Sequence, residues 1–384
     1  MIFLKNLLTI ISLKIIKLVN NFIPKKNNQI IFFSRPEYSD NSLALYKKML
    51  EKNMDVEYTF VWAVENPDLY HNFDQRAIFV SHKSFNAIWK YMRSKYIVRT
   101  HSFFGTECSR RQKMINVWHG MPLKRIGEME IPRNRQKKNH YDYMPVTGEL
   151  FRYIISQCFN TSPDRNFITG LPRNDFLFSS IDVLSMMNIE TKNKKVILWM
   201  PTFRKSSFNN IEGRESETGL PVIGYSDIHL LKNTLEKLDI ILLIKPHQFE
   251  NSKLARLEDG NLRIIKNEDI PVGYTIYHIL SQCDALLTDF SSVYVDYLIL
   301  DRPIGFVYDD IIEYKANRGF IIEEIESVMP GETINDFQGL LDFLYSISKN
   351  FDNYSEDRKL VNKQFNRFTD NRNSERLIKT VWNR

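Results

Sequence analysis

Short apolar runs alternate with amphipathic stretches along almost the whole chain, and this alternation restricts the fold more than any other feature. In the first half the runs are Ile30–Ser34, Tyr58–Val64, Ala77–Val80, Tyr96–Arg99, Ile115–Trp118 and Phe167–Thr169. In the second half they are Val196–Met200, Ile240–Lys245, Leu262–Ile265, Ala285–Thr288 and Ile304–Val307. Apolar strands that alternate with helices form parallel sheets covered on both faces. The sequence therefore predicts an α/β protein with two doubly wound, Rossmann-type domains.

The length and one polar segment predict how these domains divide the chain. A chain of 384 residues exceeds what a single hydrophobic core usually supports. The segment Ser179–Lys195 is polar at its ends and rich in lysine before the next apolar run. We therefore expect one domain over residues 24–185 and another over residues 186–384, which ends in helices from Asn335 onward. The polar stretch Lys205–Leu220 follows a strand and is predicted to be a mobile loop.

Residues 1–23 show the pattern of an amphipathic helix. Their apolar residues recur at spacings of three and four: Leu4, Leu8, Ile11, Ile15, Leu18 and Phe22. Lys14 and Lys17 interrupt the apolar run, which disfavours a membrane-spanning helix, and no small-residue cleavage site follows. We predict a helix that lies in the membrane interface. The alternative is that the stripe packs against the body of the protein or against a partner.

Composition and charge exclude several classes of protein. The chain is 43% hydrophobic and 26% charged, which is typical of a folded globular protein. Its net charge of +6 is mild for the length, so we expect no nucleic-acid partner. The charge suits a protein that handles phosphates or lies on an anionic membrane surface. Cys108, Cys158 and Cys283 are widely separated, which disfavours a disulfide framework or a structural zinc site and favours a reducing compartment.

The chain lacks the short motifs of several enzyme classes. It contains no G-x-G-x-x-G, no Walker A loop, no H-E-x-x-H and no G-x-S-x-G. These absences disfavour dinucleotide redox chemistry, P-loop nucleotide hydrolysis, a zincin and a typical serine hydrolase. Asp289 and Asp296 are not arranged as the close carboxylate cluster of a metal site. We therefore predict no metal and no cofactor.

Ligands of open parallel sheets bind outside the carboxyl ends of the strands, so the residues that follow each apolar run are the candidates for a site. In the first half, His119 follows Ile115–Trp118 and precedes a glycine, and Lys124 comes shortly after. Imidazole titrates near neutral pH and can accept a proton from an attacking hydroxyl. Taken alone, a histidine at a strand end is also compatible with a structural role.

The second half repeats this arrangement with cationic and hydroxyl side chains. Arg204 follows Val196–Met200, and Lys245 and His247 follow the next strand, where they can stabilise phosphate charge. The alternative for each is an ordinary solvated loop.

A further strand ends in Thr288 and Asp289, and Ser291 or Ser292 then begins a helix over Val293–Leu300. Hydroxyls and unpaired N–H groups at a helix start bind anions, although an ordinary serine N-cap has the same sequence. Arg318 can bind a diphosphate with its planar guanidinium.

Several motifs occur together and in a fixed order. They are VWHGMPLKRIG (117–127), YDYMPVTGELF (141–151), TGLPRND (169–175), MPTFRKS (200–206), IKPHQ (244–248), LLTDFSSVYVDYLILDRPIGFVYDD (286–310) and YKANRGF (314–320). Together they resemble the CDP-glycerol glycerophosphotransferase family of teichoic acid synthesis. The chain departs from the family pattern at Gln248, where proline is common, and at Met121, where threonine is common. Neither departure removes a candidate catalytic group.

The resemblance implies a GT-B-like architecture, in which two Rossmann-type domains face a cleft. The second domain would hold the nucleotide donor, and the first would face the acceptor, with Lys124 on the acceptor side. His119 matches the family's general base, and His247 matches a second histidine near the donor phosphates. Arg204, Lys245, Ser291, Ser292 and Arg318 match positions near the donor phosphates. Thr288 and Asp289, at the end of the strand before the two serines, are also assigned to donor or phosphate binding.

The expected activity is the transfer of glycerol phosphate from CDP-glycerol to a hydroxyl of a lipid-linked glycan or polyol-phosphate acceptor, with release of CMP, in teichoic acid or capsule polymer synthesis. The resemblance implies peripheral attachment to the cytoplasmic face of the membrane. Three alternatives stay open: a CDP-ribitol phosphotransferase, a GT-B glycosyltransferase that uses a nucleotide sugar, and a membrane-associated scaffold without activity. A homo-oligomer also stays open.

Overall fold

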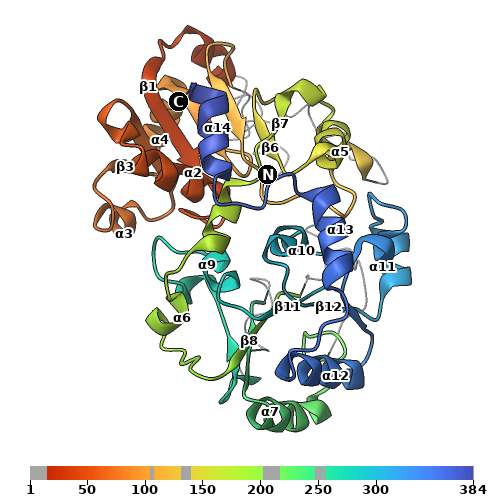
Figure 1. The fold of residues 1–384 in the computed structure, drawn as a ribbon. Helices are drawn as coiled ribbons and strands as arrows, with labels where there is room; N and C mark the ends of the chain where they lie inside the picture. The colour runs from red at the N-terminus through yellow and green to blue at the C-terminus, as the bar shows by residue number, and fades with distance from the viewer. Residues whose placement is uncertain are drawn as a thin grey trace, which may run out of the picture. The chain divides into compact units, whose positions relative to one another are not determined.

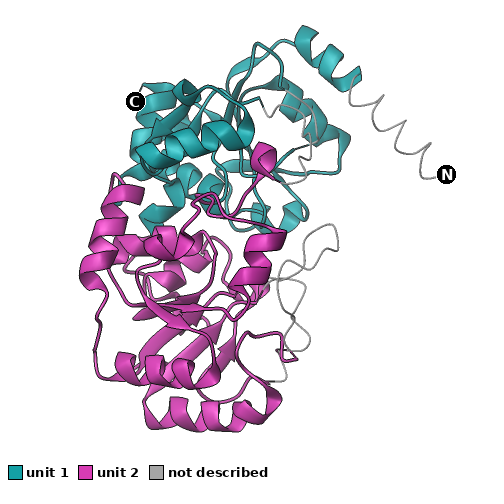
Figure 2. Cartoon of the chain, turned by 90° about the vertical axis from the view of Figure 1, so that its right-hand side faces the viewer, with its two compact units in different colours: residues 1–119, 136–176, 370–384 teal, residues 120–135, 177–369 magenta. Residues whose placement is uncertain are grey.

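The computed structural model describes residues 15–103, 108–130, 140–201, 217–246, 254 and 257–383. The chain divides into two compact units (Figure 1 and Figure 2). Unit 1 comprises residues 1–119, 136–176 and 370–384, and unit 2 comprises residues 120–135 and 177–369. The α/β class predicted from the alternation of apolar runs is confirmed, because each unit is built on a parallel sheet with helices.

In the described part of unit 1, five parallel strands pair in the order β3-β2-β1-β4-β5. The strands are β1 (Lys26–Phe33), β2 (Thr59–Val64), β3 (Ala77–Ser81), β4 (Ser94–Arg99) and β5 (Lys113–Asn116). A smaller parallel pair, β6 (Met144–Val146) and β7 (Asn166–Ile168), is joined to β5 by a bridge between Tyr143 and Ile115. The strands β2 and β3 follow on one side of β1, whereas β4 and β5 lie on its other side. Open α/β sheets bind ligands at such a switch point in strand order, here between β1 and β4.

The core of unit 1 is built around the first two strands of this sheet. Phe32 on β1 stacks on Trp62 of β2 with 5.0 Å between the ring centroids, and both side chains are fully buried. Burial of such large aromatic groups contributes strongly to stability. Besides the N-terminal helix, the described helices of unit 1 are α2 (Asp40–Glu51), α3 (Pro67–His71), α4 (Phe85–Arg93), α5 (Glu149–Phe159) and the C-terminal α14 (Asn373–Trp382).

In the described part of unit 2, six parallel strands pair in the order β10-β9-β8-β11-β12-β13, with the switch point between β8 and β11. The strands are β8 (Lys195–Trp199), β9 (Ile240–Ile244), β10 (Leu262–Ile264), β11 (Ala285–Thr288), β12 (Ile304–Val307) and β13 (Glu332–Ile334). All of the apolar runs predicted to be strands of this half form strands. The sequence did not predict β13, because two of its three residues are exposed and polar.

Helices and one glycine complete the core of unit 2. The helices are α6 (Val183–Met186), α7 (Ile228–Lys237), α9 (Ile276–Leu280), α10 (Val293–Tyr297), α11 (Ile311–Asn317), α12 (Phe337–Ser348) and α13 (Ser355–Phe365). Gly305 on β12 allows the neighbouring side chains to close over the strand. A Cβ atom there would lie 2.6 Å from Leu287 and 2.9 Å from Ile334, so any side chain would force the core apart.

The predicted N-terminal helix is described over residues 15–22, and residues 1–14 lie outside the described part. Asn20 is buried and donates to Gln112 at 2.8 Å, whereas Ile15, Leu18 and Phe22 of the predicted apolar stripe are exposed. No helix among the described residues has the length and apolar character needed to cross a membrane. Most of the predicted loop Lys205–Leu220 lies outside the described residues.

Each unit contains one segment that comes from the other half of the sequence. Residues 120–135 belong to unit 2, where Lys124 forms an antiparallel bridge with Phe320. Residues 370–384 belong to unit 1, where the carboxylate of Asp175 accepts the backbone N–H groups of Asn373 and Ser374 at 2.8 and 2.9 Å. The sequence predicted neither exchange, because both depend on contacts between residues that are distant along the chain.

Candidate functional site

His119 lies just beyond the end of β5, at the strand end predicted from the sequence. The preceding residue, Trp118, has φ of 50°, a left-handed conformation that is rare for a bulky residue. The side-chain amide of Asn41 donates to the carbonyl oxygens of Val117 and Trp118 at 3.0 and 3.1 Å and so holds this turn in place. The backbone therefore presents the His119 imidazole at the carboxyl end of the unit 1 sheet.

Two aromatic rings lie close to the His119 imidazole. The Trp118 ring lies 3.9 Å away at 34°, and the His101 ring lies 4.4 Å away at 9°, measured between centroids. Nδ1 lies 3.4 Å from the carbonyl oxygen of Thr100. A carbonyl oxygen only accepts hydrogen bonds, so Nδ1 carries the proton and Nε2 carries the lone pair. Nε2 is therefore the atom that can act as a base.

The surroundings keep this imidazole unprotonated. Burial, followed by the neighbouring His101 and Arg173, lowers the pKa of His119 to about 3, against a weaker opposing effect of the hydrogen bond to Thr100. Removal from water disfavours the charged ring, and nearby positive charges disfavour it further. At neutral pH the ring is in the form that a general base requires.

A buried ion pair supports this end of unit 1. Arg173 donates from Nη1 to Asp40 at 3.0 Å, and its backbone N–H donates to the side-chain oxygen of Asn41 at 2.9 Å. Both members of the pair are buried. Sequence reasoning did not select His101, Asn41 or Arg173. His101 follows the run Tyr96–Arg99, so the rule that ligands lie at strand ends could have identified it.

In unit 2 the predicted donor residues lie on neighbouring strand ends. Thr288 is fully buried at the end of β11 and donates to the carbonyl oxygen of Met200, which follows β8, at 3.1 Å. Asp289 is also fully buried. Lys245 follows β9, the next strand beyond β8, and burial lowers its pKa while Glu268 and Asp269 act in the opposite direction. These residues share the carboxyl edge of the sheet.

The predicted helix after β11 exists, as α10 followed by a 3₁₀ turn over Leu298–Leu300. Ser291 and Ser292 are partly exposed at its start, and Ser292 forms no side-chain cap to the helix. Phe290, next to Ser291, packs against three aromatic rings at centroid distances of 4.8 to 4.9 Å: Tyr308, Tyr314 and Phe320. This packing fixes the backbone that carries the two serines.

Arg318 and Lys124 lie near the same aromatic group. Nη2 of Arg318 is 3.1 Å from the Glu130 carboxylate, and Nζ of Lys124 lies 5.4 Å from the centroid of the Tyr314 ring. The structure thus brings Lys124 together with the predicted donor residues of unit 2, although the sequence assigned it to the acceptor side. Its role stays a prediction. Arg204 and His247 lie outside the described residues, and their roles also stay predictions.

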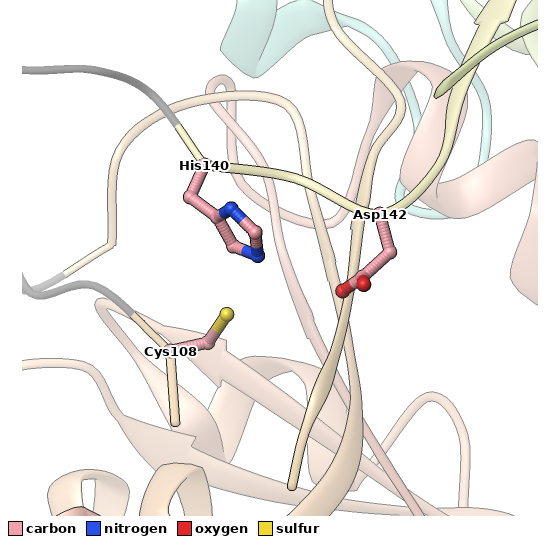
Figure 3. A group of neighbouring side chains, drawn as sticks. All are labelled: Cys108, His140 and Asp142. Atoms are coloured by element: carbon pink, nitrogen blue, oxygen red, sulfur yellow. The ribbon is translucent and has the colours of Figure 1, made fainter. Parts of the chain in front are cut away.

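Cys108, His140 and Asp142 in unit 1 form a cluster whose ligand atoms lie within 4.8 Å of one another (Figure 3). Nη1 of Arg165 lies 3.1 Å from Nδ1 of His140, and Nζ of Lys113 lies 3.6 Å from Asp142. A guanidinium only donates, so the proton of the neutral imidazole lies on Nε2, which points toward Cys108 and Asp142 (Figure 3). A metal would need that lone pair, and two cations already lie nearby. The proton on Nε2 and the two neighbouring cations therefore disfavour metal binding by this cluster.

Proteins of known function match this chain over most of its length. The teichoic acid glycerol-phosphate transferase of Staphylococcus aureus (strain NCTC 8325 / PS 47) is 26% identical over 94% of each chain. The teichoic acid poly(glycerol phosphate) polymerase of Bacillus spizizenii (strain ATCC 23059 / NRRL B-14472 / W23) is 26% identical over 88% of this chain and 87% of its own. The teichoic acid ribitol-phosphate polymerase TarL of the same Staphylococcus aureus strain is 27% identical over 93% of this chain and 63% of its own.

Solved structures of the wall teichoic acid polymerase TagF share the fold. One variant matches with a TM-score of 0.75 and 22% identity over 94% of this chain and 89% of its own. A variant soaked with CDPG matches with a TM-score of 0.74 over 97% of this chain and 92% of its own. The fold is therefore GT-B-like, with two Rossmann-type units. The CDP-Glycerol:Poly(glycerophosphate) glycerophosphotransferase family matches residues 15–383. The chain belongs to this family and is a transferase of teichoic acid biosynthesis.

Proposed function

We propose that the protein transfers glycerol phosphate from CDP-glycerol to a hydroxyl of a lipid-linked glycan or polyol-phosphate acceptor and releases CMP. The observation that carries the proposal is the state of His119, whose Nδ1 faces the Thr100 carbonyl and whose Nε2 is an unprotonated base. The names of the glycerol-phosphate relatives and the TagF structure soaked with CDPG support the choice of donor.

The reaction is an in-line displacement at the β-phosphorus of the donor. The acceptor hydroxyl forms the new P–O bond while its proton moves to Nε2 of His119, and the bond to the CMP oxygen breaks. General base catalysis of this kind contributes roughly 10²–10⁴-fold to the rate. The His119 imidazole needs no change of tautomer for this step, because its proton is already on Nδ1.

Unit 2 supplies the groups for the donor phosphates under this proposal. Negative charge grows on the leaving CMP, and Arg318, Lys245, Ser291 and Ser292 are the described candidates to stabilise it. One preorganised donor of this type stabilises a transition state by about 3–4 kcal/mol. Arg204 and His247 have the same role through the family resemblance alone. Unit 1 would then bind the acceptor.

A donor panel tests the proposal directly. The purified protein is incubated with a lipid-linked polyol-phosphate acceptor and, separately, with CDP-glycerol, CDP-ribitol, UDP-sugars and GDP-sugars. We expect CMP release and a lengthened acceptor with CDP-glycerol. Release of UDP or GDP would instead identify a glycosyltransferase, and the absence of any nucleotide binding would identify a scaffold.

CDP-ribitol is the second candidate donor, because the ribitol-phosphate polymerase TarL is as similar in sequence as the glycerol-phosphate relatives. The same assay distinguishes the two, because each donor is supplied separately. The donor whose incubation gives the faster CMP release and the lengthened acceptor is the substrate.

We further propose that residues 1–23 attach the protein to the cytoplasmic face of the membrane. Asn20 anchors the described part of this helix to unit 1, because it donates to Gln112 and accepts from Lys25 at 2.7 Å. The side chains of Ile15, Leu18 and Phe22 are exposed on the other side. This arrangement supports the prediction of a helix in the membrane interface over the alternative in which the apolar stripe packs against the body of the protein.

Vesicle flotation with matched leucine variants tests the attachment. Leu18 and Leu360 are both 62% exposed, but Leu360 lies on α13 in unit 2. We expect Leu18→Ser and deletion of residues 1–23 to reduce binding to vesicles that contain anionic lipid, and Leu360→Ser to leave binding unchanged. Equal binding of the deletion variant and the full chain would rule out this attachment.

A further inference from the structure

One residue, Thr100, holds both His101 and His119. Its carbonyl oxygen lies 3.4 Å from Nδ1 of His119, and its hydroxyl oxygen lies 2.9 Å from Nδ1 of His101. Thr100 itself is fully buried and continues the pairing of β4 with β1, because its N–H donates to the Phe33 carbonyl at 3.1 Å. The two rings that share this support stack with an interplanar angle of 9°.

The charges around the two rings differ. Burial lowers the pKa of His101, while Asp40 opposes this shift and Arg35 adds to it; burial, His101 and Arg173 all lower the pKa of His119. The ring centroids are 4.4 Å apart, so two protonated rings would repel each other strongly. The pair therefore binds one proton before the other. Burial, with His101 and Arg173, lowers the pKa of His119 to about 3, whereas Asp40 opposes the lowering at His101, so the first proton goes to His101.

We propose that His101 is a positioning residue for His119. Its ring fixes the plane of the His119 imidazole, and it takes up the first proton that the pair binds. Together with burial, the charge on His101 then keeps the Nε2 lone pair of His119 available for the proton of the acceptor hydroxyl. The last part of this inference rests on the proposed function, whereas the order of protonation does not.

The proposed role of His101 agrees with the bonds that form and break in the transfer step. The hydroxyl O–H bond breaks, an N–H bond forms on Nε2 of His119, the oxygen bonds to the β-phosphorus, and CMP leaves with the electron pair of the broken P–O bond. A proton that resided on His119 beforehand would block this step. A proton on His101 leaves Nε2 available, although its positive charge opposes a second proton on the neighbouring ring.

Three variants separate positioning from a general structural effect. His101→Ala removes the ring, His101→Phe keeps a stacking surface without a titrating group, and His82→Ala removes a histidine that follows β3 as His101 follows β4. We expect kcat of His101→Ala to fall by about 10–100-fold, with donor affinity within about twofold, because misplacement of a catalytic group has this effect. His101→Phe should recover most of this loss at neutral pH, and His82→Ala should behave as the wild type.

Histidine nitrogen NMR of the full-length protein tests the inference independently of catalysis. In the wild type we expect His119 as the neutral tautomer with its proton on Nδ1, and His101 should protonate first as the pH falls. In His101→Phe, His119 should protonate at higher pH than in the wild type. The inference is overturned if His101→Ala retains wild-type kcat, if His119 protonates before His101, or if His101→Phe leaves the titration of His119 unchanged. If the wild type transfers no phospho-polyol, the proposed function fails, and the NMR titration still decides the role of His101.

Discussion

The guanidinium of Arg318 forms an ion pair with the carboxylate of Glu130, with 3.1 Å between Nη2 and Oε1. Both side chains are only partly buried. Arg318 is the predicted ligand of the donor diphosphate, so a phosphate oxygen and the Glu130 carboxylate would compete for the same guanidinium. We therefore predict that Glu130 influences donor affinity.

Glu130→Gln should strengthen donor binding, because it removes the competing negative charge. A partly exposed ion pair contributes about 0.5–1 kcal/mol, which corresponds to roughly a two- to fivefold lower Kd for CDP-glycerol. Calorimetric titration with the donor measures it. Arg318→Ala should have the opposite effect.

The matched control is Glu326→Gln, which breaks the ion pair of Glu326 with Lys315 on α11 at 2.9 Å. It should leave the Kd unchanged. A weaker donor affinity in Glu130→Gln would contradict the competition.

His119→Asn should lower kcat by about 10²–10⁴-fold, because the acceptor hydroxyl then loses its general base. Binding of CDP-glycerol should remain, since the predicted donor ligands lie in unit 2. The kcat comes from CMP release, and the Kd comes from titration with the donor. His71→Asn, an exposed histidine on α3, serves as the control. Turnover of His119→Asn close to that of the wild type would exclude His119 as the base.

The lowered pKa of His119 also predicts a loss of stability in acid. The unfolded chain binds a proton at this histidine below pH about 6.5, whereas the folded chain binds it only near pH 3. The unfolded state therefore binds more protons between these values, and the free energy of unfolding falls as the pH falls. Between pH 7 and pH 5 this single group should account for about 2 kcal/mol of that loss.

Urea unfolding at pH 7 and pH 5 measures this effect. The difference in unfolding free energy between the two pH values should be smaller in His119→Asn than in the wild type, and unchanged in His71→Asn. An equal difference in all three proteins would show that the folded state protonates His119 as readily as the unfolded chain does.

The C-terminal helix α14 depends on a carboxylate from a distant part of unit 1. Asp175 accepts the first two N–H groups of α14, from Asn373 and Ser374. Asp175→Ala should destabilise the protein by about 0.5–2 kcal/mol, the range for loss of a helix N-cap. Thermal unfolding measures this loss, and limited proteolysis should release a C-terminal fragment more rapidly.

Asp164→Ala is the control, because the side chain of Asp164 is 89% exposed. It should leave both the melting temperature and the digestion rate unchanged. Unaltered digestion of Asp175→Ala would show that α14 is held by its apolar contacts alone.

The sequence by itself determined the strands and most of the strand-end candidates. Runs such as Val196–Met200 and Ile240–Lys245 are apolar on both faces, and only a central parallel strand buries both faces, so pattern and structure agree. His119, Lys245 and Thr288 were found for the same reason, because a strand end is a local feature of the chain. The strand β6 (Met144–Val146) was missed because a proline stands at its centre, and β13 was missed because two of its three residues are exposed and polar.

Only the tertiary structure decided which distant residues meet. The stacking of His101 on His119, the pairing of Lys124 with Phe320 and the capping of α14 by Asp175 join residues separated by between 18 and 198 positions. No local pattern encodes such contacts, because they follow from the order of strands in the sheet and the path of the connecting loops. The chemistry of each side chain belongs to the sequence, whereas the tautomer and charge of His119 arise from the neighbours that the fold brings to it.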